Sequence, residues 1–348
     1  MTDWEIYTGS REPHDGISRL PAPPPWRAFS GEPVLSAPAP DPAARRPGAT
    51  YLPSQDAVRQ VNAALYLRRP LLVTGLPGTG KSTLADAIAH ELRLGPVLRW
   101  PITSRSTLRQ GLYEYDPLSR LYAASRQEDG PDSQGPVPGT PETDPDDIGG
   151  FIRLGPLGTA LLPYAHPRVL LIDEIDKSDI DLPNDLLTIF ETGSYEIIEL
   201  ARRAAPSARV MTADGTKSRV EVRDGTVTCR EFPLVIMTSN GEREFPPAFL
   251  RRCLTLSLKQ PATEGELSAI VAQHLSGVVG GNGGLPEQSR RIIAHFFQRR
   301  DSGLLANDQL LNAIFLCHHA LLDSPPGDVL ALADQVMPYL SGDQPNDG

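Results

Sequence analysis

Short apolar runs alternate with helix-like spacing through the middle of the chain. Five segments are predicted to be buried strands, because nearly continuous apolar character is typical of parallel strands covered on both faces: 70–75, 96–102, 168–173, 232–240 and 254–258. Helical spacing, or helix start and stop signals, marks the segments 54–69, 82–92, 184–193 and 246–253. This alternation predicts a doubly wound α/β fold with a parallel sheet of about five strands flanked by helices.

The strand signals end at Gln260. Beyond it, four segments have apolar residues at helical spacing: 262–275, 286–299, 306–322 and 327–340. We therefore expect an α/β core over residues 51–259, followed by a small all-helical lid domain over residues 260–348. Within the core, a helix is predicted over much of 104–125, and the segments between residues 195 and 232 suggest a short β-hairpin.

Residues 1–50 have the composition of an extended arm. Proline is dense around RLPAPPPWRAF (19–29), which disfavours a helix or a central strand. Two interpretations of the arm stay open: a disordered leader, or a segment that Trp26 and Phe29 anchor on the body or on a neighbouring subunit. Residues 128–150, rich in Pro, Gly and acids, are expected to form a long mobile loop.

Composition narrows the class of protein. The 348 residues carry a formal net charge of −10, which argues against a protein built to coat nucleic acid or an anionic membrane. No apolar run approaches the ~20 residues needed to cross a bilayer, and the polar N-terminal segment does not resemble a signal peptide. Cys229, Cys253 and Cys317 lie far apart, so neither a zinc site nor a disulfide framework is expected. These features favour a cytoplasmic protein with reduced thiols.

The segment after the first expected strand matches the phosphate-binding pattern G-x-x-x-x-G-K-[ST]. Its glycines allow several backbone N–H groups to point at a β-phosphate, and the following helix adds its positive N-terminal end. Lys81 is expected to reach the β- and γ-phosphates, and the Ser82 hydroxyl to ligate Mg²⁺. A chance glycine loop is a poor explanation, since a strand precedes the motif and a helix follows it. The expected nucleotide-binding residues are Gly75, Leu76, Pro77, Gly78, Thr79, Gly80, Lys81, Ser82 and Thr83.

A second motif is the carboxylate pair Asp173–Glu174, which ends the expected strand 168–173. Ligands of open α/β sheets bind at the carboxyl ends of the strands. There Asp173 can hold Mg²⁺ through its water shell, and Glu174 can orient and deprotonate the attacking water. An acidic pair after a strand is usually a solvated strand end, but the phosphate-binding loop upstream favours the functional interpretation.

Two further positions complete the expected catalytic set. Asn240 closes the strand 232–240, where a neutral amide can hydrogen-bond the γ-phosphate and the water, although Asn is also a common turn former. Arg251 and Arg252 follow a short helix. Nothing upstream except Lys81 supplies positive charge to the γ-phosphate, so we expect an arginine that projects into the site of the adjacent subunit. The alternative for this pair is a solvated helix end.

Taken together, these motifs resemble an AAA+ ATPase: GLPGTGKST (75–83), VLLIDEID (169–176), the TSN strand end (238–240) and PPAFLRRC (246–253). Three further segments resemble the MoxR group of the helix-2-insert clade: TLRQGLYEYD (107–116), IRLGPLGTALL (152–162) and LPNDLLTIFETGSYEI (182–197). PPPWRAF and TSNGEREFPPAFLRRC are similar to MoxR-like ATPases of bacterial conflict systems, which are encoded beside von Willebrand A domain proteins.

The resemblance implies ATP and Mg²⁺ as cofactors and a P-loop fold with a helical lid. It also implies a homo-oligomeric, hexameric ring with Arg252 at the finger position. The activity implied is ATP hydrolysis coupled to chaperone-like remodelling of a protein partner, with a von Willebrand A domain protein as the candidate. The insert around 104–125 and the acidic loop 128–150 are candidate contact surfaces for that partner. No guanine-reading Asn-Lys-x-Asp motif is present, which leaves GTP formally open.

One departure from the family pattern concerns the lid. Members usually carry a sensor 2 arginine at the start of the third lid helix, but Gln309 stands near that place, with Arg299 and Arg300 earlier. This departure keeps open a nucleotide-dependent switch or scaffold with little turnover. A nucleic-acid motor is disfavoured by the acidic balance and the absence of a basic stripe. His318 and His319 are adjacent on a helix, so they cannot share a metal and are interpreted as surface residues.

Overall fold

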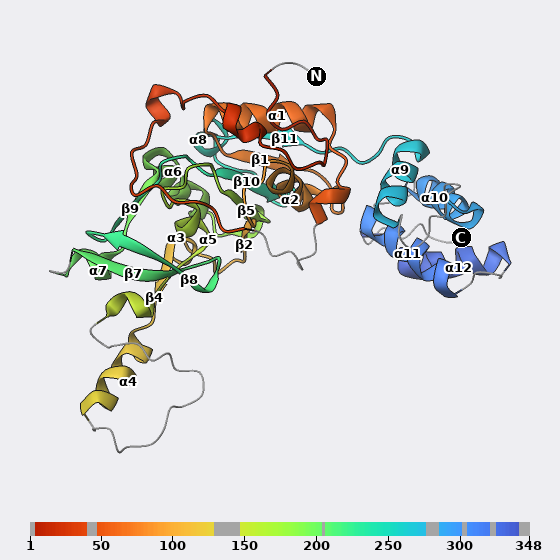
Figure 1. Ribbon diagram of the computed structural model, residues 1–348. Coiled ribbons are helices and arrows are strands. Elements are labelled where there is room, and N and C mark those ends of the chain that lie inside the picture. The colour runs from red at the N-terminus through yellow and green to blue at the C-terminus, as the bar shows by residue number, and fades with distance from the viewer. Residues whose placement is uncertain are drawn as a thin grey trace.

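The computed structural model describes residues 4–39, 47–128, 147–203, 206–275, 285–300, 305–320 and 325–340. A five-stranded sheet in the order β11-β1-β10-β5-β2 forms the centre of the core, and every neighbouring pair in it is parallel (Figure 1). The expected parallel sheet is confirmed. Its strands are β1 (Leu71–Thr74), β2 (Leu98–Pro101), β5 (Val169–Asp173), β10 (Leu234–Ser239) and β11 (Leu254–Ser257).

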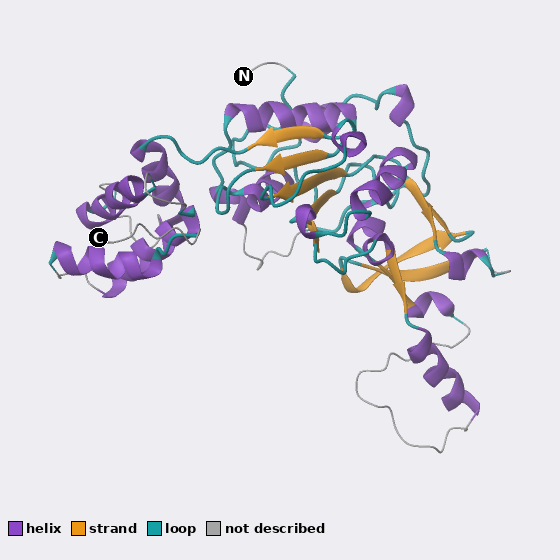
Figure 2. Cartoon of the chain, turned by 180° about the vertical axis from the view of Figure 1, so that it is seen from behind, coloured by secondary structure: helices purple, strands orange, loops and turns teal. Residues whose placement is uncertain are grey.

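Alternate residues of the strands enter two separate cores, because successive side chains of a strand point to opposite faces. On one face, Leu71 and Val73 pack with residues of α1 (Gln55–Leu67) and α2 (Lys81–Glu91). On the other face, Leu72 packs with residues of α5 (Pro156–Ala160) and α6 (Leu182–Thr192). Figure 2 shows the strands between these helices from behind. Burial on both faces explains why the strands are continuously apolar.

A second sheet of six strands lies beside the core, in the order β3-β4-β7-β8-β9-β6. It contains the expected hairpin, but as part of a larger sheet. Its strands are β3 (Tyr113–Tyr115), β4 (Ile152–Leu154), β6 (Ser194–Glu196), β7 (Ser207–Thr212), β8 (Gly215–Arg223) and β9 (Thr226–Thr228), and the short helix α7 (Ile198–Ala201) follows β6.

The single helix expected over much of 104–125 is wrong. The segment forms α3 (Leu108–Leu112), then strand β3, then α4 (Pro117–Glu128). The helix is interrupted because Tyr113–Tyr115 pairs antiparallel with β4, about forty residues later in the sequence. Of the expected loop 128–150, residues 129–146 lie outside the described residues.

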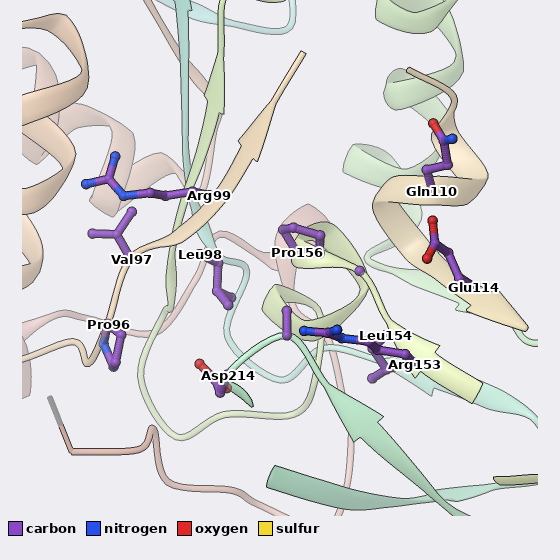
Figure 3. Close-up of a pocket in the computed structure, with 12 residues that line it drawn as sticks. Pro96, Val97, Leu98, Arg99, Gln110, Glu114, Arg153, Leu154, Pro156 and Asp214 are labelled. Carbon is purple, nitrogen blue, oxygen red and sulfur yellow. The ribbon is translucent and has the colours of Figure 1, made fainter. Parts of the chain in front are cut away.

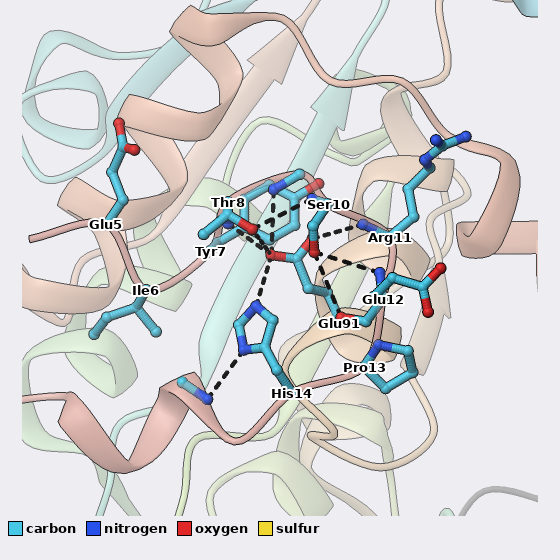
Figure 4. A network of polar contacts seen from close by, with 12 residues as sticks. Glu5, Ile6, Tyr7, Thr8, Ser10, Arg11, Glu12, Pro13, His14 and Glu91 are labelled. Atoms are coloured by element: carbon cyan, nitrogen blue, oxygen red, sulfur yellow. Dashed lines mark hydrogen bonds and ion pairs between the residues drawn. The ribbon is translucent and has the colours of Figure 1, made fainter. Parts of the chain in front are cut away.

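Residues 4–39 of the N-terminal arm lie against the core. Asn62 of α1 is fully buried, accepts hydrogen bonds from the N–H groups of Ile6 (2.7 Å) and Tyr7 (3.0 Å), and donates to the Tyr7 carbonyl (2.7 Å). Glu91 of α2 accepts from several groups of the segment 8–14, as Figure 4 shows. A buried carboxylate needs such partners. Polar side chains of the core therefore fix the path of the arm.

The two aromatic residues singled out in the arm behave differently. The ring of Phe29 packs against that of Phe232, with centroids 6.1 Å apart, which supports the anchored interpretation for this residue. Trp26 lies on a 3₁₀ turn, Pro25–Arg27, and remains 78% exposed. Phe29 is therefore an anchor of the arm on the body, whereas Trp26 is not.

The C-terminal part contains four helices around a core of their own. They are α9 (Glu264–Leu275), α10 (Glu287–Arg299), α11 (Asn307–Ala320) and α12 (Pro326–Val336). Figure 1 shows them at the end of the core opposite to α8 (Pro247–Leu250). The boundaries that divide the chain into arm, core and lid stay predictions. Within the described ranges, every helix is too short or too polar to span a bilayer.

Candidate nucleotide site

The phosphate-binding loop connects β1 to α2 and has backbone angles that favour glycine. Gly75 has φ of 151°, and a Cβ atom at this position would lie 2.5 Å from the carbonyl oxygen of Leu258. Lys81 begins α2 and is 8% exposed; its Nζ donates to the carbonyls of Gly75 (2.8 Å) and Leu76 (2.9 Å). The side chain thus bends back over the loop, where phosphate oxygens could replace the two carbonyls as its partners.

The first metal-ligating residue expected from the loop contacts the acidic strand. Ser82 Oγ donates to Asp173 Oδ1 at 2.7 Å, which joins the start of α2 to the end of β5. Thr238 of β10, between β1 and β5 in the sheet, donates to the same Asp173 oxygen at 2.5 Å. Thr238 Oγ1 also accepts from the backbone N–H of Glu174 at 2.9 Å. Residues of α2 and β10 therefore fix the carboxylate at the end of β5, beside the phosphate-binding loop.

This donor set fits Mg²⁺. The ion prefers oxygen ligands, keeps several waters, and is usually held by one or two protein groups together with substrate phosphates. A hydroxyl and a carboxylate oxygen 2.7 Å apart match that chemistry. The described residues contain no cluster of three or more His, Cys, Asp or Glu that could hold a metal by themselves. Ser82 and Asp173 would therefore hold the ion only together with nucleotide and water.

Glu174 adopts a left-handed backbone conformation, with φ of 59° and ψ of 49°. Such angles are uncommon for a residue with a side chain, and they cluster at functional sites. One carboxylate oxygen pairs with Lys177 Nζ at 2.9 Å. The other lies 3.5 Å from Asn240 Nδ2, at the outer limit of a hydrogen bond. The fold therefore brings Glu174 and Asn240 together.

Burial has a larger effect on the pKa of Lys81 than the charges of the neighbouring carboxylates have. Desolvation lowers the pKa of its ammonium group, while Asp176, Asp173 and Glu174 oppose that change in this order. Three carboxylates therefore share one partly buried cation. The site is electrostatically prepared for a ligand that brings both negative phosphates and a divalent cation.

Three residues of the site were not singled out from the sequence: Thr238, Lys177 and Asp176. Asp176 is 4% exposed, and its Oδ2 accepts from the backbone N–H groups of Asn240 (2.9 Å) and Glu242 (3.1 Å). It thereby ties the turn after β5 to the turn after β10. For Asp176 the one signal in the sequence was a third acid two residues after Glu174, which looks like an ordinary solvated charge.

Arg251 and Arg252 do not reach the nucleotide site of their own chain through any contact between described residues. Arg252 pairs through Nε with Glu191 at the end of α6 and donates to the Ala248 carbonyl at 3.3 Å. Arg251 is exposed, and its carbonyl accepts from Arg69. Both arginines lie at the α8 end of the core, away from the lid (Figure 1). The predicted finger is therefore positioned outside the site of its own chain.

The start of α11 packs directly on the phosphate-binding loop. A Cβ at Gly78 would lie 2.8 Å from the Ala306 Cβ, 2.8 Å from the Asn307 nitrogen and 2.9 Å from Asp308 Oδ1. Gln309, at the place expected for sensor 2, accepts from the Ala306 N–H and donates to the Pro338 carbonyl, both at 2.8 Å. Its amide therefore stabilises the lid.

Arg299 and Arg300, the two arginines that precede Gln309, have their identified partners outside the phosphate-binding loop. Arg299 pairs with Asp334 at 2.7 Å and stacks over Tyr339, with its guanidinium carbon 4.7 Å from the ring centroid. Arg300 donates to the Pro261 carbonyl at 2.8 Å. Arg299 thus contacts other residues of the lid, and Arg300 contacts the connection between the lid and the core.

A cavity of about 510 Å³ lies away from the phosphate-binding loop, between β2 and the second sheet. Figure 3 shows Gln110 and Glu114 on one side of it and Asp214 below. Asp214 forms an ion pair with the fully buried Arg168, at 2.7 Å. No residue of the loop 75–83 or of the pair Asp173–Glu174 lines this cavity, so it is separate from the nucleotide site.

A search of curated protein sequences finds no match. Among solved structures, a structure of C. elegans PCH-2 is similar with a TM-score of 0.37 and 16% identity, over 81% of this chain and 64% of that chain. The family model "AAA domain (dynein-related subfamily)" matches residues 70–253, which is more than half of the chain and includes the loop, the acidic pair, Asn240 and both arginines. The chain belongs to the dynein-related subfamily of the AAA domain family.

Proposed function

We propose that this protein binds Mg²⁺-ATP at the phosphate-binding loop and hydrolyses it to ADP and phosphate. The observation that carries the proposal is the contact between Ser82 and Asp173 at 2.7 Å, directly beside Lys81 at the start of α2. Family membership supports it, since AAA domains generally hydrolyse ATP. The adenine base is proposed over guanine because the chain has no Asn-Lys-x-Asp motif.

The residues divide the work as follows. Backbone N–H groups of the loop and the ammonium of Lys81 bind the phosphates and hold the γ-phosphate in line with the attacking water. Glu174 accepts a proton from that water, and Asn240 orients it. Mg²⁺, when bound at Ser82 and Asp173, neutralises part of the charge on the phosphate oxygens. Lys177 must release Glu174 for this role; their ion pair is about 40% exposed on both sides, so it is weak.

We propose that Arg252 completes the site of a neighbouring copy in a ring, and that the ring is a hexamer of the MoxR type. An arginine supplied in trans stabilises charge on the transferred phosphoryl group and raises turnover by about 10³–10⁵-fold. Two observations support this assignment. Among the residues that the structure describes, Lys81 and Lys177 are the cations in contact with the site's own loop and acids, and Arg252 follows α8 at the end of the core opposite to the lid.

Mixing two inactive variants tests this arrangement. Lys81→Ala removes the phosphate-binding lysine but keeps the finger, and Arg252→Ala keeps the site but removes the finger. Each variant alone should lose at least about 10²-fold of the ATPase rate. A mixture should recover measurable turnover, because some Arg252→Ala sites then adjoin an intact Arg252. A mixture as inactive as either variant alone would contradict the action of Arg252 in trans. The ATPase rate of Arg251→Ala shows whether the adjacent arginine is needed for turnover.

The released energy is proposed to remodel a protein client, as in MoxR-like ATPases, with a von Willebrand A domain protein as the candidate. The six-stranded sheet and α4 project from the core (Figure 1) and offer a surface for such a client. Pull-down with a Glu174→Gln variant in Mg²⁺-ATP, compared with the same variant in ADP, tests this part. A client retained equally in both nucleotides would contradict coupling between hydrolysis and release.

A second candidate function is a nucleotide-dependent switch with little turnover. It is favoured by the lid, where Gln309 is engaged with Ala306 and Pro338 instead of the nucleotide loop. Phosphate release measured over many turnovers separates the two candidates. A switch releases about one phosphate per site and stops, whereas the proposed ATPase continues at a constant rate.

A further inference from the structure

Trp26 is the most exposed of the large hydrophobic side chains in the described parts of the chain, at 78%. It lies on a 3₁₀ turn, Pro25–Arg27, preceded by two further prolines, Pro23 and Pro24. Proline restricts the backbone, so the turn is stiff before anything binds to it. A preordered, exposed Trp loses little conformational entropy on docking and can bury about 150–250 Å².

The residues on either side of Trp26 are fastened to the core. Arg27 donates to the Arg68 carbonyl at 2.6 Å and to the Phe190 carbonyl, and its guanidinium carbon lies 4.6 Å from the centroid of the Phe232 ring. Phe29 packs on the same ring. With Arg27 and Phe29 both tied down, the turn presents Trp26 outward from the core.

The same contacts connect the turn that carries Trp26 to the proposed finger through the end of α6. Arg27 contacts the carbonyl of Phe190, the next residue, Glu191, pairs with Arg252, and Glu191 acts electrostatically on Arg27. We define the finger face as Trp26, Leu67, Leu250, Arg251 and Arg252. Leu67 and Leu250 are each 39% exposed, and Arg251 is exposed. Figures 1 and 2 both show the turn and α8 at the end of the core opposite to the lid.

We propose that Trp26 is the apolar anchor of the contact between copies: where Arg252 enters the site of a second copy, Trp26 seats on the lid of that copy. The proposal rests on the proposed function. Charge complementarity identifies the occupant: the finger face carries the exposed Arg251 and the Glu191-paired Arg252, while the other end carries Asp173 and Glu174 and is proposed to bind phosphates. Because the two surfaces lie at opposite ends of one chain, copies associate head to tail, as in a closed ring.

The lid offers an apolar surface for Trp26 at that end. Phe315 and Leu316 of α11 are 47% and 37% exposed. The first turn of the same helix packs on the phosphate-binding loop at Gly78. A neighbour whose arginine enters the site therefore has an exposed aromatic–aliphatic pair within the same element, and Trp is the residue most enriched at the energetic centres of interfaces.

Assembly of the full chain tests the anchor. Sedimentation velocity over a range of protein concentrations, in Mg²⁺ with a non-hydrolysable ATP analogue, compares wild type with Trp26→Ala. The expected result is at least about a tenfold rise in the concentration of half-assembly, with binding of fluorescent nucleotide unchanged. Tyr122→Ala, an exposed aromatic on α4 at 63%, is the matched control and should assemble like wild type. Unchanged assembly of Trp26→Ala would overturn the proposal.

A cross-linking experiment tests the docking partner. Cys229, Cys253 and Cys317 are buried, so a short bis-maleimide should react only with introduced cysteines. A chain carrying both Trp26→Cys and Phe315→Cys should give a ladder of covalent oligomers, whereas either substitution alone should give none. Covalent dimers from Trp26→Cys alone would overturn the head-to-tail contact. Failure of ATP turnover in wild type with an intact ladder would reject the ATPase and leave the interface standing.

Discussion

Asp176 accepts a hydrogen bond from the backbone N–H of Asn240 at 2.9 Å, across 64 residues of sequence. The same oxygen accepts from Glu242 at 3.1 Å, so one buried carboxylate positions the turn that carries the amide of Asn240. Asn240 Nδ2 in turn lies 3.5 Å from Glu174. The distance between the proposed base and the residue that orients water therefore depends on Asp176, which holds the turn after β10 by its backbone.

Replacing Asp176 should separate positioning from binding. Asp176→Ala leaves two partly buried N–H groups without their acceptor, so we expect a loss of about 1–2 kcal/mol in the free energy of unfolding. The kcat should fall by at least tenfold with a smaller change in KM, because Lys81 keeps its contacts with the loop carbonyls and the charges of Asp173 and Glu174. Asp176→Asn keeps one acceptor oxygen and should recover part of both losses.

Steady-state kinetics and urea unfolding measure these effects. Asp181→Ala is the matched control, since Asp181 is exposed and its side chain makes no capping hydrogen bond at α6. A change in KM as large as that in kcat would assign Asp176 to nucleotide binding instead.

Glu174→Gln should abolish turnover without abolishing binding. The amide cannot accept a proton from water, so the ATPase rate should fall by about 10²–10⁴-fold. Nucleotide affinity should stay within a few fold, since Lys81, Ser82 and Asp173 remain. Phosphate release and fluorescent-nucleotide titration measure the two quantities, and Glu242→Gln serves as a nearby acidic control. Equal turnover in wild type and Glu174→Gln would contradict the assignment of Glu174 as the general base.

Asn62→Ala should loosen the N-terminal arm. The substitution leaves the buried N–H groups of Ile6 and Tyr7 and the Tyr7 carbonyl without their partner, so the free energy of unfolding should fall by about 2–4 kcal/mol. Limited proteolysis should then cut within residues 4–39 faster than in wild type. Gln60→Ala, on the same helix but only partly buried, is the control. An arm as resistant as in wild type would mean that Glu91 and Arg68 suffice to hold it.

Thiol chemistry should follow burial. Desolvation raises the pKa of both Cys229 and Cys253 to about 12. At pH 8 about one thiol in 10⁴ is then ionised, so maleimide should modify the native protein far more slowly than the urea-unfolded protein. These groups bind their protons more tightly when folded, so they stabilise the fold below pH 9 and lose that contribution as pH rises from 9 to 12. Denaturation titrations across that interval check the sign; Cys229→Ser and Cys253→Ser should flatten the slope.

Local patterns in the sequence determined much of the core. Continuous apolar runs identified the five parallel strands, because a strand buried on both faces is apolar at nearly every position and is therefore distinct from a polar loop. The glycine-rich loop, with Lys81 and Ser82, and the strand ending in Asp173 and Glu174 are recognisable for a similar reason: backbone geometry and phosphate chemistry restrict which residues fit there. The lid helices followed from apolar spacing alone.

Tertiary structure decided the rest, because it depended on contacts between residues far apart in the chain. Tyr113–Tyr115 became a strand by pairing with β4, which overrode its helical surroundings. Asp176 and Thr238 gained their roles only when β5 and β10 were placed side by side. The arm lies along the core because Asn62 and Glu91 of the core accept hydrogen bonds from its backbone. The local pattern of prolines in the arm does not predict these contacts. The spacing of apolar residues along the sequence predicts which faces of helices and strands are buried. Which polar side chains contact one another depends on the tertiary structure.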